Sequence, residues 1–145
     1  MEFSIKSGDN YSHIVVDIIQ YRYPNKTNFG DGNWVDARIM VVLPGYTADF
    51  SAYLRIDEIN NFMKDMKTAY QDLQSIVRFQ PREPWIEFIM EPNKPGQFII
   101  KGKATNPLGI GAVLSFEFRN NQSYFMETIV QVDKIMKTFP VKGNP

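Results

Sequence analysis

The chain of 145 residues is long enough for one domain with a substantial core, and 43% hydrophobic and 22% charged residues are typical of a folded globular protein. The 16 basic residues balance 16 acidic ones, and this zero net charge gives no reason to expect binding to nucleic acid or to an anionic membrane. The absence of cysteine excludes disulfides, a thiolate nucleophile and a cysteine-based zinc site.

The first third of the chain reads as strands joined by turns. The run YSHIVVDIIQYRY is rich in β-branched and aromatic residues, which favour strands, and Pro44-Gly45 suits the centre of a type II turn. We expect no signal peptide, because the N-terminal residues are polar, and no apolar run approaches the roughly 18 residues that cross a bilayer. The strands predicted here cover residues 2–6, 11–23, 34–43 and 46–54.

A helix and a second group of strands follow. Apolar residues recur at helical spacing from Ile56 to Leu73, and Asp57 is predicted as the N-cap of this helix. Further strands are predicted at 84–91, 97–104 and 112–119, and a last helix at about 123–138. Short turns between neighbouring strands indicate antiparallel pairing. The sequence therefore predicts one α+β domain over residues 1–145, a mostly antiparallel β-sheet of about six to seven strands with two α-helices packed on one face.

Alternation along the strands separates an apolar face from a polar face that the helices leave uncovered. Two interpretations of the polar face remain open. It is either a solvated face with charges paired across strands, or a protein-binding surface, because tryptophan and arginine are enriched at binding hot spots. The polar face holds Trp34, Asp36, Arg38, Glu83, Trp85, Glu87, Glu91, Glu117 and Arg119.

No group of residues supports catalysis. The single histidine, His13, lies in an apolar strand and reads as structural. Glu83, Glu87 and Glu91 share one face of a strand, where successive members lie ~13 Å apart, too far for paired acid–base chemistry. We expect neither enzymatic activity nor a metal or cofactor, although the residues alone leave open a hydrolase that uses only carboxylates.

Three short motifs carry a resemblance to a known family. They are D-G-N-W-V at 31–35, N-N-Q-S-Y at 120–124 and F-P-V-K-G at 139–143. In these motifs, and in the order of elements over about residues 12–143, the chain resembles the WapI-type immunity proteins. These are small bacterial proteins encoded beside polymorphic or contact-dependent toxins. Asn121 stands where an aspartate is common in the family, and both residues cap helices.

The resemblance implies a cytoplasmic antitoxin that binds and occludes a cognate C-terminal toxin domain, commonly a nuclease, without a cofactor and without contacting nucleic acid or membrane. The toxin, its contact residues and the oligomeric state stay open. Against a basic nuclease, acidic residues are expected to steer association and to mimic substrate phosphates, with tryptophans as anchors. The residues expected to bind the toxin are Trp34, Asp36, Glu83, Trp85, Glu87, Glu91 and Glu117.

Two other interpretations are open. Seven methionines and many aromatic residues suit an adaptable apolar cavity, so the alternative is a small-molecule or lipid-binding module with its ligand between sheet and helices. A third interpretation is a structural subunit that associates with itself through an exposed strand edge.

Overall fold

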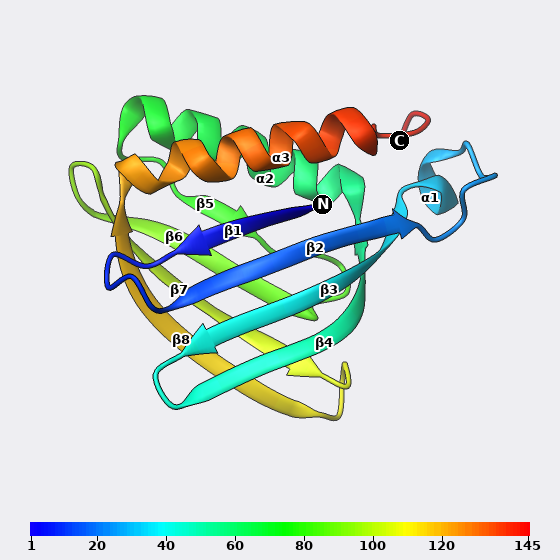
Figure 1. Cartoon of the computed structure of the whole chain (residues 1–145). Coiled ribbons are helices and arrows are strands. Elements are labelled where there is room, and N and C mark those ends of the chain that lie inside the picture. The colour runs from blue at the N-terminus through cyan, green and yellow to red at the C-terminus, as the bar shows by residue number, and fades with distance from the viewer.

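A computed structural model describes residues 1–145, and its strands form two antiparallel sheets of four strands each (Figure 1). Both sheets are meanders, in which strands adjacent in sequence are adjacent in space. Sheet A has the order β1 (Glu2–Lys6), β2 (His13–Tyr21), β3 (Trp34–Leu43) and β4 (Tyr46–Arg55). Sheet B has the order β5 (Val77–Phe79), β6 (Ile86–Lys94), β7 (Gln97–Asn106) and β8 (Ala112–Asn121).

A long helix follows each sheet, and the two helices lie beside one another on one side of the molecule (Figure 1). α2 (Ile56–Asp72) follows sheet A and contacts β5, whereas α3 (Phe125–Thr138) follows sheet B and contacts β1. Each helix therefore covers the first strand of the other sheet. Two shorter elements are α1 (Phe29–Gly32), between β2 and β3, and the 3₁₀ turn η1 (Gln122–Tyr124), which leads into α3.

The core is one cluster of 31 buried hydrophobic residues that joins both sheets to the helices. Phe62 of α2 shows how: its ring centroid lies 5.5 Å from those of Phe3 in β1 and Phe88 in β6, and 5.6 Å from that of Phe79 in β5. Burying one such ring contributes about 1.5–3 kcal/mol. The apolar stripe of one helix thus fastens the two sheets together.

The predicted α+β class and the antiparallel pairing are confirmed, and most element boundaries agree to within a few residues. The predicted single sheet is corrected to two sheets, because β4 pairs only with β3 and leads directly into α2. Sequence reasoning missed β5 and α1, which have only three and four residues and so show no periodicity. The N-cap prediction for Asp57 was wrong: α2 begins at Ile56, and Asp57 lies in its first turn.

Candidate functional site

Aromatic and charged side chains gather at the end of sheet A where β3 begins and β4 ends. Trp34 is the first residue of β3, and Tyr53 of β4 lies opposite Asp36 in the register of the two strands. All three point away from the core, because the residues that alternate with them, such as Val35 and Leu54, are buried. The β3–β4 register therefore brings two rings and a carboxylate to one place.

Arg22 and Tyr23, directly after β2, join this cluster. The Arg22 guanidinium carbon lies 3.8 Å from the ring centroid of Tyr53, and its Nη1 lies 3.3 Å from Asp36 Oδ1. Its Nε donates a hydrogen bond to the Tyr23 hydroxyl at 3.3 Å, and this bond is the main cause that raises the pKa of Arg22. Arg22 is thus a fixed positive charge stacked on an aromatic face.

The segment before β6 supplies the remaining members. The Trp85 ring centroid lies 6.3 Å from those of Phe50 and Tyr53, and Trp85 Nε1 donates to Glu83 Oε2 at 3.4 Å. A hollow of about 320 Å³ opens beside these groups, lined by Arg22, Tyr23, Trp34, Tyr53 and Glu83. We define the aromatic surface as Arg22, Tyr23, Trp34, Asp36, Tyr53, Glu83 and Trp85.

The seven residues predicted for binding lie in two separate places. Trp34, Asp36, Glu83 and Trp85 belong to the aromatic surface. The other three lie on the outer face of sheet B, where Glu87 Oε1 is 3.4 Å from Lys103 Nζ. They are Glu87, Glu91 and Glu117. The predicted set splits because Glu83 and Trp85 precede β6 and lie against sheet A, whereas the other three glutamates lie within β6 and β8 of sheet B.

The predicted set lacks Arg22, Tyr23 and Tyr53. Tyr53 could have been found, because it alternates with the buried residues Ala52 and Leu54 along YTADFSAYLR. Arg22 and Tyr23 lie inside the strand predicted at 11–23, but β2 ends at Tyr21, and beyond a strand the alternation no longer indicates a direction. Their place in the cluster depends on tertiary contacts alone.

Two of the sequence motifs, D-G-N-W-V and F-P-V-K-G, meet at Asn33, the residue before Trp34. Asn33 is fully buried; its Nδ2 donates to the carbonyls of Phe29 (3.0 Å) and Lys142 (2.9 Å), and its Oδ1 accepts from the Lys142 N–H (2.8 Å). Gly143 has φ of +67°, and a Cβ there would lie 2.6 Å from the Phe29 nitrogen, so the position favours glycine. Asn33 therefore fastens the F-P-V-K-G segment to the D-G-N-W-V segment.

Arg55 completes this connection from the end of β4. It is 1% exposed, and its guanidinium donates to the carbonyls of Gly30 (2.7 Å) and Phe29 (2.8 Å) while its Nε lies 3.0 Å from Asp57 Oδ1. Its guanidinium carbon lies 5.2 Å from the Trp34 ring centroid. We define the clasp as Phe29, Gly30, Asn33, Arg55, Asp57, Lys142 and Gly143. Through Arg55, the clasp contacts Trp34, which also lines the hollow.

The third motif forms the junction between β8 and α3. Asn121 is the N-cap of the short turn η1, and its side chain accepts a hydrogen bond from the Ser123 N–H at 3.0 Å. Asn120 is buried, and its Nδ2 donates to the Lys6 carbonyl at 3.0 Å. This motif therefore ties β8 to the end of β1.

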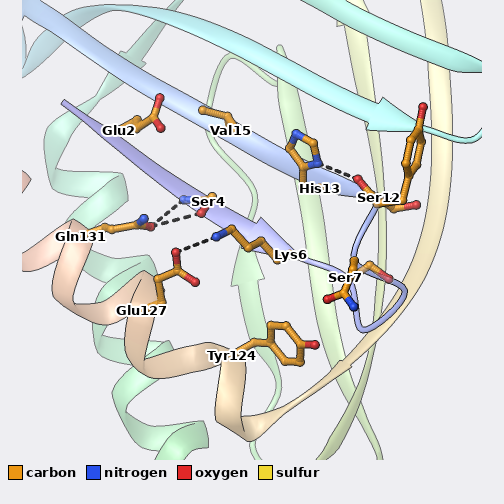
Figure 2. A pocket seen from close by; sticks show the side chains of 12 residues that line it. Glu2, Ser4, Lys6, Ser7, Ser12, His13, Val15, Tyr124, Glu127 and Gln131 are labelled. Atoms are coloured by element: carbon orange, nitrogen blue, oxygen red, sulfur yellow. Dashed lines mark hydrogen bonds and ion pairs between the residues drawn. The ribbon is translucent and has the colours of Figure 1, made fainter.

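The largest hollow, about 470 Å³, lies between β1, the turn after it and the start of α3 (Figure 2). Polar side chains dominate its lining: Lys6 Nζ lies 2.8 Å from Glu127 Oε1, and Gln131 Oε1 accepts from the Ser4 N–H at 2.9 Å. His13 also lines it, with Nδ1 2.7 Å from the Tyr11 carbonyl. This polar hollow differs from the apolar ligand cavity that the alternative interpretation requires.

Two further features bear on the class of site. No group of three histidine, aspartate or glutamate side chains is arranged to hold a metal ion. None of the helices combines the length and the apolar composition that crossing a membrane requires. The candidate site that the described residues offer is therefore a surface of rings and charges.

Comparison with known proteins identifies the family. The family model described as the immunity protein WapI-like family matches residues 4–140. The chain belongs to the WapI-like immunity protein family. No curated protein matches it. As a WapI-like immunity protein, it falls in a family that is generally non-catalytic, and membership indicates a role in immunity. The match includes the first two motifs and ends at Pro140, inside the third.

Proposed function

We propose that this WapI-like protein is a cytoplasmic immunity protein that binds its cognate C-terminal toxin domain and neutralises it by occlusion, without catalysis. Family membership carries this proposal. The aromatic surface supports it, because it combines exposed tyrosines and an arginine with two half-buried tryptophans, and these residue types dominate binding hot spots. In this proposal the toxin is a nuclease, whose basic substrate-binding groups meet Glu83, while Asp36 holds Arg22 in place at 3.3 Å.

The outer face of sheet B is the second candidate surface. Glu87, Glu91 and Glu117 alternate there with buried residues, but basic side chains share the face. Lys103 lies 3.4 Å from Glu87, and Lys101 is opposite Glu117 in the register. Paired charges of this kind hold one another and attract a basic partner less strongly. We therefore place the main contact on the aromatic surface.

Co-expression with the C-terminal domain of the large protein encoded beside this gene tests the proposal. Growth rescue together with co-purification is the expected result. Failure of both, with each protein folded, would contradict it.

Alanine variants separate the two surfaces. Tyr23→Ala and Glu83→Ala are expected to weaken toxin binding at least about tenfold, since exposed aromatic and charged anchors carry most binding energy. Glu117→Ala is the control on sheet B, with affinity expected within about twofold of the native protein. Titration calorimetry measures all three, and the opposite ranking would move the contact to sheet B.

A further inference from the structure

The four outer edges of the two sheets differ in how they are covered. At β1, Gln131 of α3 accepts from the Ser4 N–H at 2.9 Å and Thr128 donates to the Ser4 carbonyl at 2.6 Å. At β5, Asp65 of α2 accepts from the Arg78 N–H at 3.2 Å. At β8, the Arg119 carbonyl accepts from the Gly8 N–H at 2.8 Å. Three edges thus have backbone partners beyond their own sheet.

The fourth edge, β4, has none. No hydrogen bond from outside sheet A reaches the backbone of residues 46–54. The Ile56 N–H donates to the Asn33 carbonyl at 2.8 Å, and this bond fixes the phase of the β3–β4 ladder. In an antiparallel ladder every second residue bonds the partner strand. Thr47, Asp49, Ser51 and Tyr53 therefore direct their N–H and C=O groups away from β3.

An apolar groove of about 400 Å³ runs beside the first half of β4, with the start of β8 as its far wall. Two of its hydrophobic side chains are well exposed, Tyr46 at 67% and Val113 at 54%. Figure 1 shows β4 and β8 on the side of the molecule opposite the helices. The lining is Tyr46, Thr47, Ala48, Asp49, Phe50, Ala104, Asn106, Ala112, Val113 and Leu114.

Exposed strand edges in natural proteins are usually protected by proline, by lysine or by a bulge. Residues 46–54 contain neither proline nor lysine, and their register with β3 is unbroken. A ten-residue strand of this kind beside an apolar groove is the arrangement that accepts an added strand.

We propose that this groove receives an extended segment of the toxin, which pairs with the backbone of Thr47 and Asp49 and places alternate apolar side chains against Ala48 and Phe50. The inference rests on the proposed function and specifies how the partner binds. Asp49 is the only charged residue in the groove, and Arg38 pairs with it through two contacts of 2.7 Å. The groove is thus nearly neutral and fits an apolar segment.

The shape of the groove argues for a partner segment over a second copy of this chain. The groove lies between β4 and β8. A segment that enters it must protrude from the partner's domain, as a hairpin or a chain end does. In a second copy, the edge of β4 that would have to pair is flanked by the β8 strand of that same copy. When the two β4 edges approach, the β8 strands of the two copies would clash.

Two proline variants on equivalent edges test the pairing. Thr47→Pro removes an N–H that points away from β3, a change that an edge strand tolerates. Ser115→Pro on β8 is the matched control, because the outward Arg119 carbonyl shows that Ser115, four residues earlier, also points outward. We expect Thr47→Pro to weaken toxin binding at least tenfold and Ser115→Pro to leave it within twofold. Undiminished binding by Thr47→Pro, or an equal loss in both variants, would overturn the inference.

Amide hydrogen exchange tests the same strand pairing in the native protein, without a substitution. The Thr47 and Asp49 amides are expected to exchange at least tenfold more slowly in the toxin complex than in the free chain. Exchange at the free rate in a complex that rescues growth overturns this inference alone, whereas absent rescue and binding overturn the proposed function. Slow exchange without toxin, together with a doubled mass, would assign the edge to a second copy and also overturn the inference.

Discussion

The clasp and the aromatic surface meet at Trp34, yet they are built in opposite ways. In the clasp, Asn33 and Arg55 are 0% and 1% exposed, and their polar groups contact carbonyls or a carboxylate of the same chain. In the aromatic surface, Tyr23 and Tyr53 are 43% and 38% exposed and border an open hollow. Two of the three family-like motifs, D-G-N-W-V and F-P-V-K-G, therefore lie in the clasp beside the surface, and the surface itself lies largely outside them.

Replacing the buried arginine is expected to have the largest effect. Arg55→Ala leaves the half-buried Asp57 carboxylate and two carbonyls without their partner, so we expect a loss of about 3–5 kcal/mol in the free energy of unfolding. Urea denaturation measures it. Arg38→Ala, at an exposed ion pair with Asp49, is the control and is expected to lose far less, because water screens an exposed pair. Equal losses would mean that the clasp contributes no more than a surface pair.

Asn33→Asp tests the hydrogen bonds of the clasp with almost no change of shape. The carboxylate cannot donate to the Phe29 and Lys142 carbonyls, and we expect a loss of about 2–3 kcal/mol. That loss corresponds to a fall in Tm of roughly 2–4 °C per kcal/mol. Asn25→Asp in the exposed loop supplies the control, with an unchanged Tm. An unchanged Tm for Asn33→Asp would show that the tail docks without Asn33.

Trp34 is part of the aromatic surface and also contacts Arg55 of the clasp. Its removal is therefore expected to affect both stability and toxin binding. Trp34→Ala loses the contact with the Arg55 guanidinium, a stabilisation of about 1–2 kcal/mol where the cation is desolvated, and also one wall of the hollow. We expect lower stability together with weaker toxin binding, measured by urea denaturation and titration calorimetry. Tyr23→Ala should change binding alone. If Trp34→Ala changes only stability, Trp34 belongs to the clasp and not to the contact surface.

Glu58 binds the backbone beside Glu83 of the aromatic surface, and replacing Glu58 is expected to have the smallest effect. Its Oε2 accepts from the Arg82 N–H at 2.9 Å, next to Glu83, and burial raises the pKa of its carboxyl above the ordinary 4.5. A raised pKa stabilises the folded state fully below pH 4.5 and loses that contribution as the pH rises through the folded value.

Glu58→Gln removes this titration. The free energy of unfolding of the variant, relative to that of the native protein, should therefore increase from about pH 4 to about pH 7, by less than about 1 kcal/mol because the carboxyl is only half-buried. Thermal melts at both pH values measure the difference. The same difference at both would indicate that Glu58 titrates as in the unfolded chain.

The sequence was sufficient for features that follow from local pattern. Alternation placed Trp34 and Asp36 on an outer face, and helical spacing located α2. Arg55 escaped prediction because its burial depends on carbonyls 25 and 26 residues away. The division into two sheets was not predicted either, because nothing in the sequence of β6 or β8 shows that these strands form a sheet separate from that of β3. Arg22 joins the surface only through the folded positions of Tyr53 and Asp36.

The crossing of helices between sheets affects how the chain folds. The backbone of Ser4 bonds to side chains of α3, 124 and 127 residues later, whereas α2 covers β5, which begins five residues after α2 ends. Pairings this distant close late in folding. A chain that lacks α3 and the F-P-V-K-G segment therefore leaves β1 uncovered and Asn33 without its Lys142 partner. Under the proposed function, we expect such a chain not to bind the toxin.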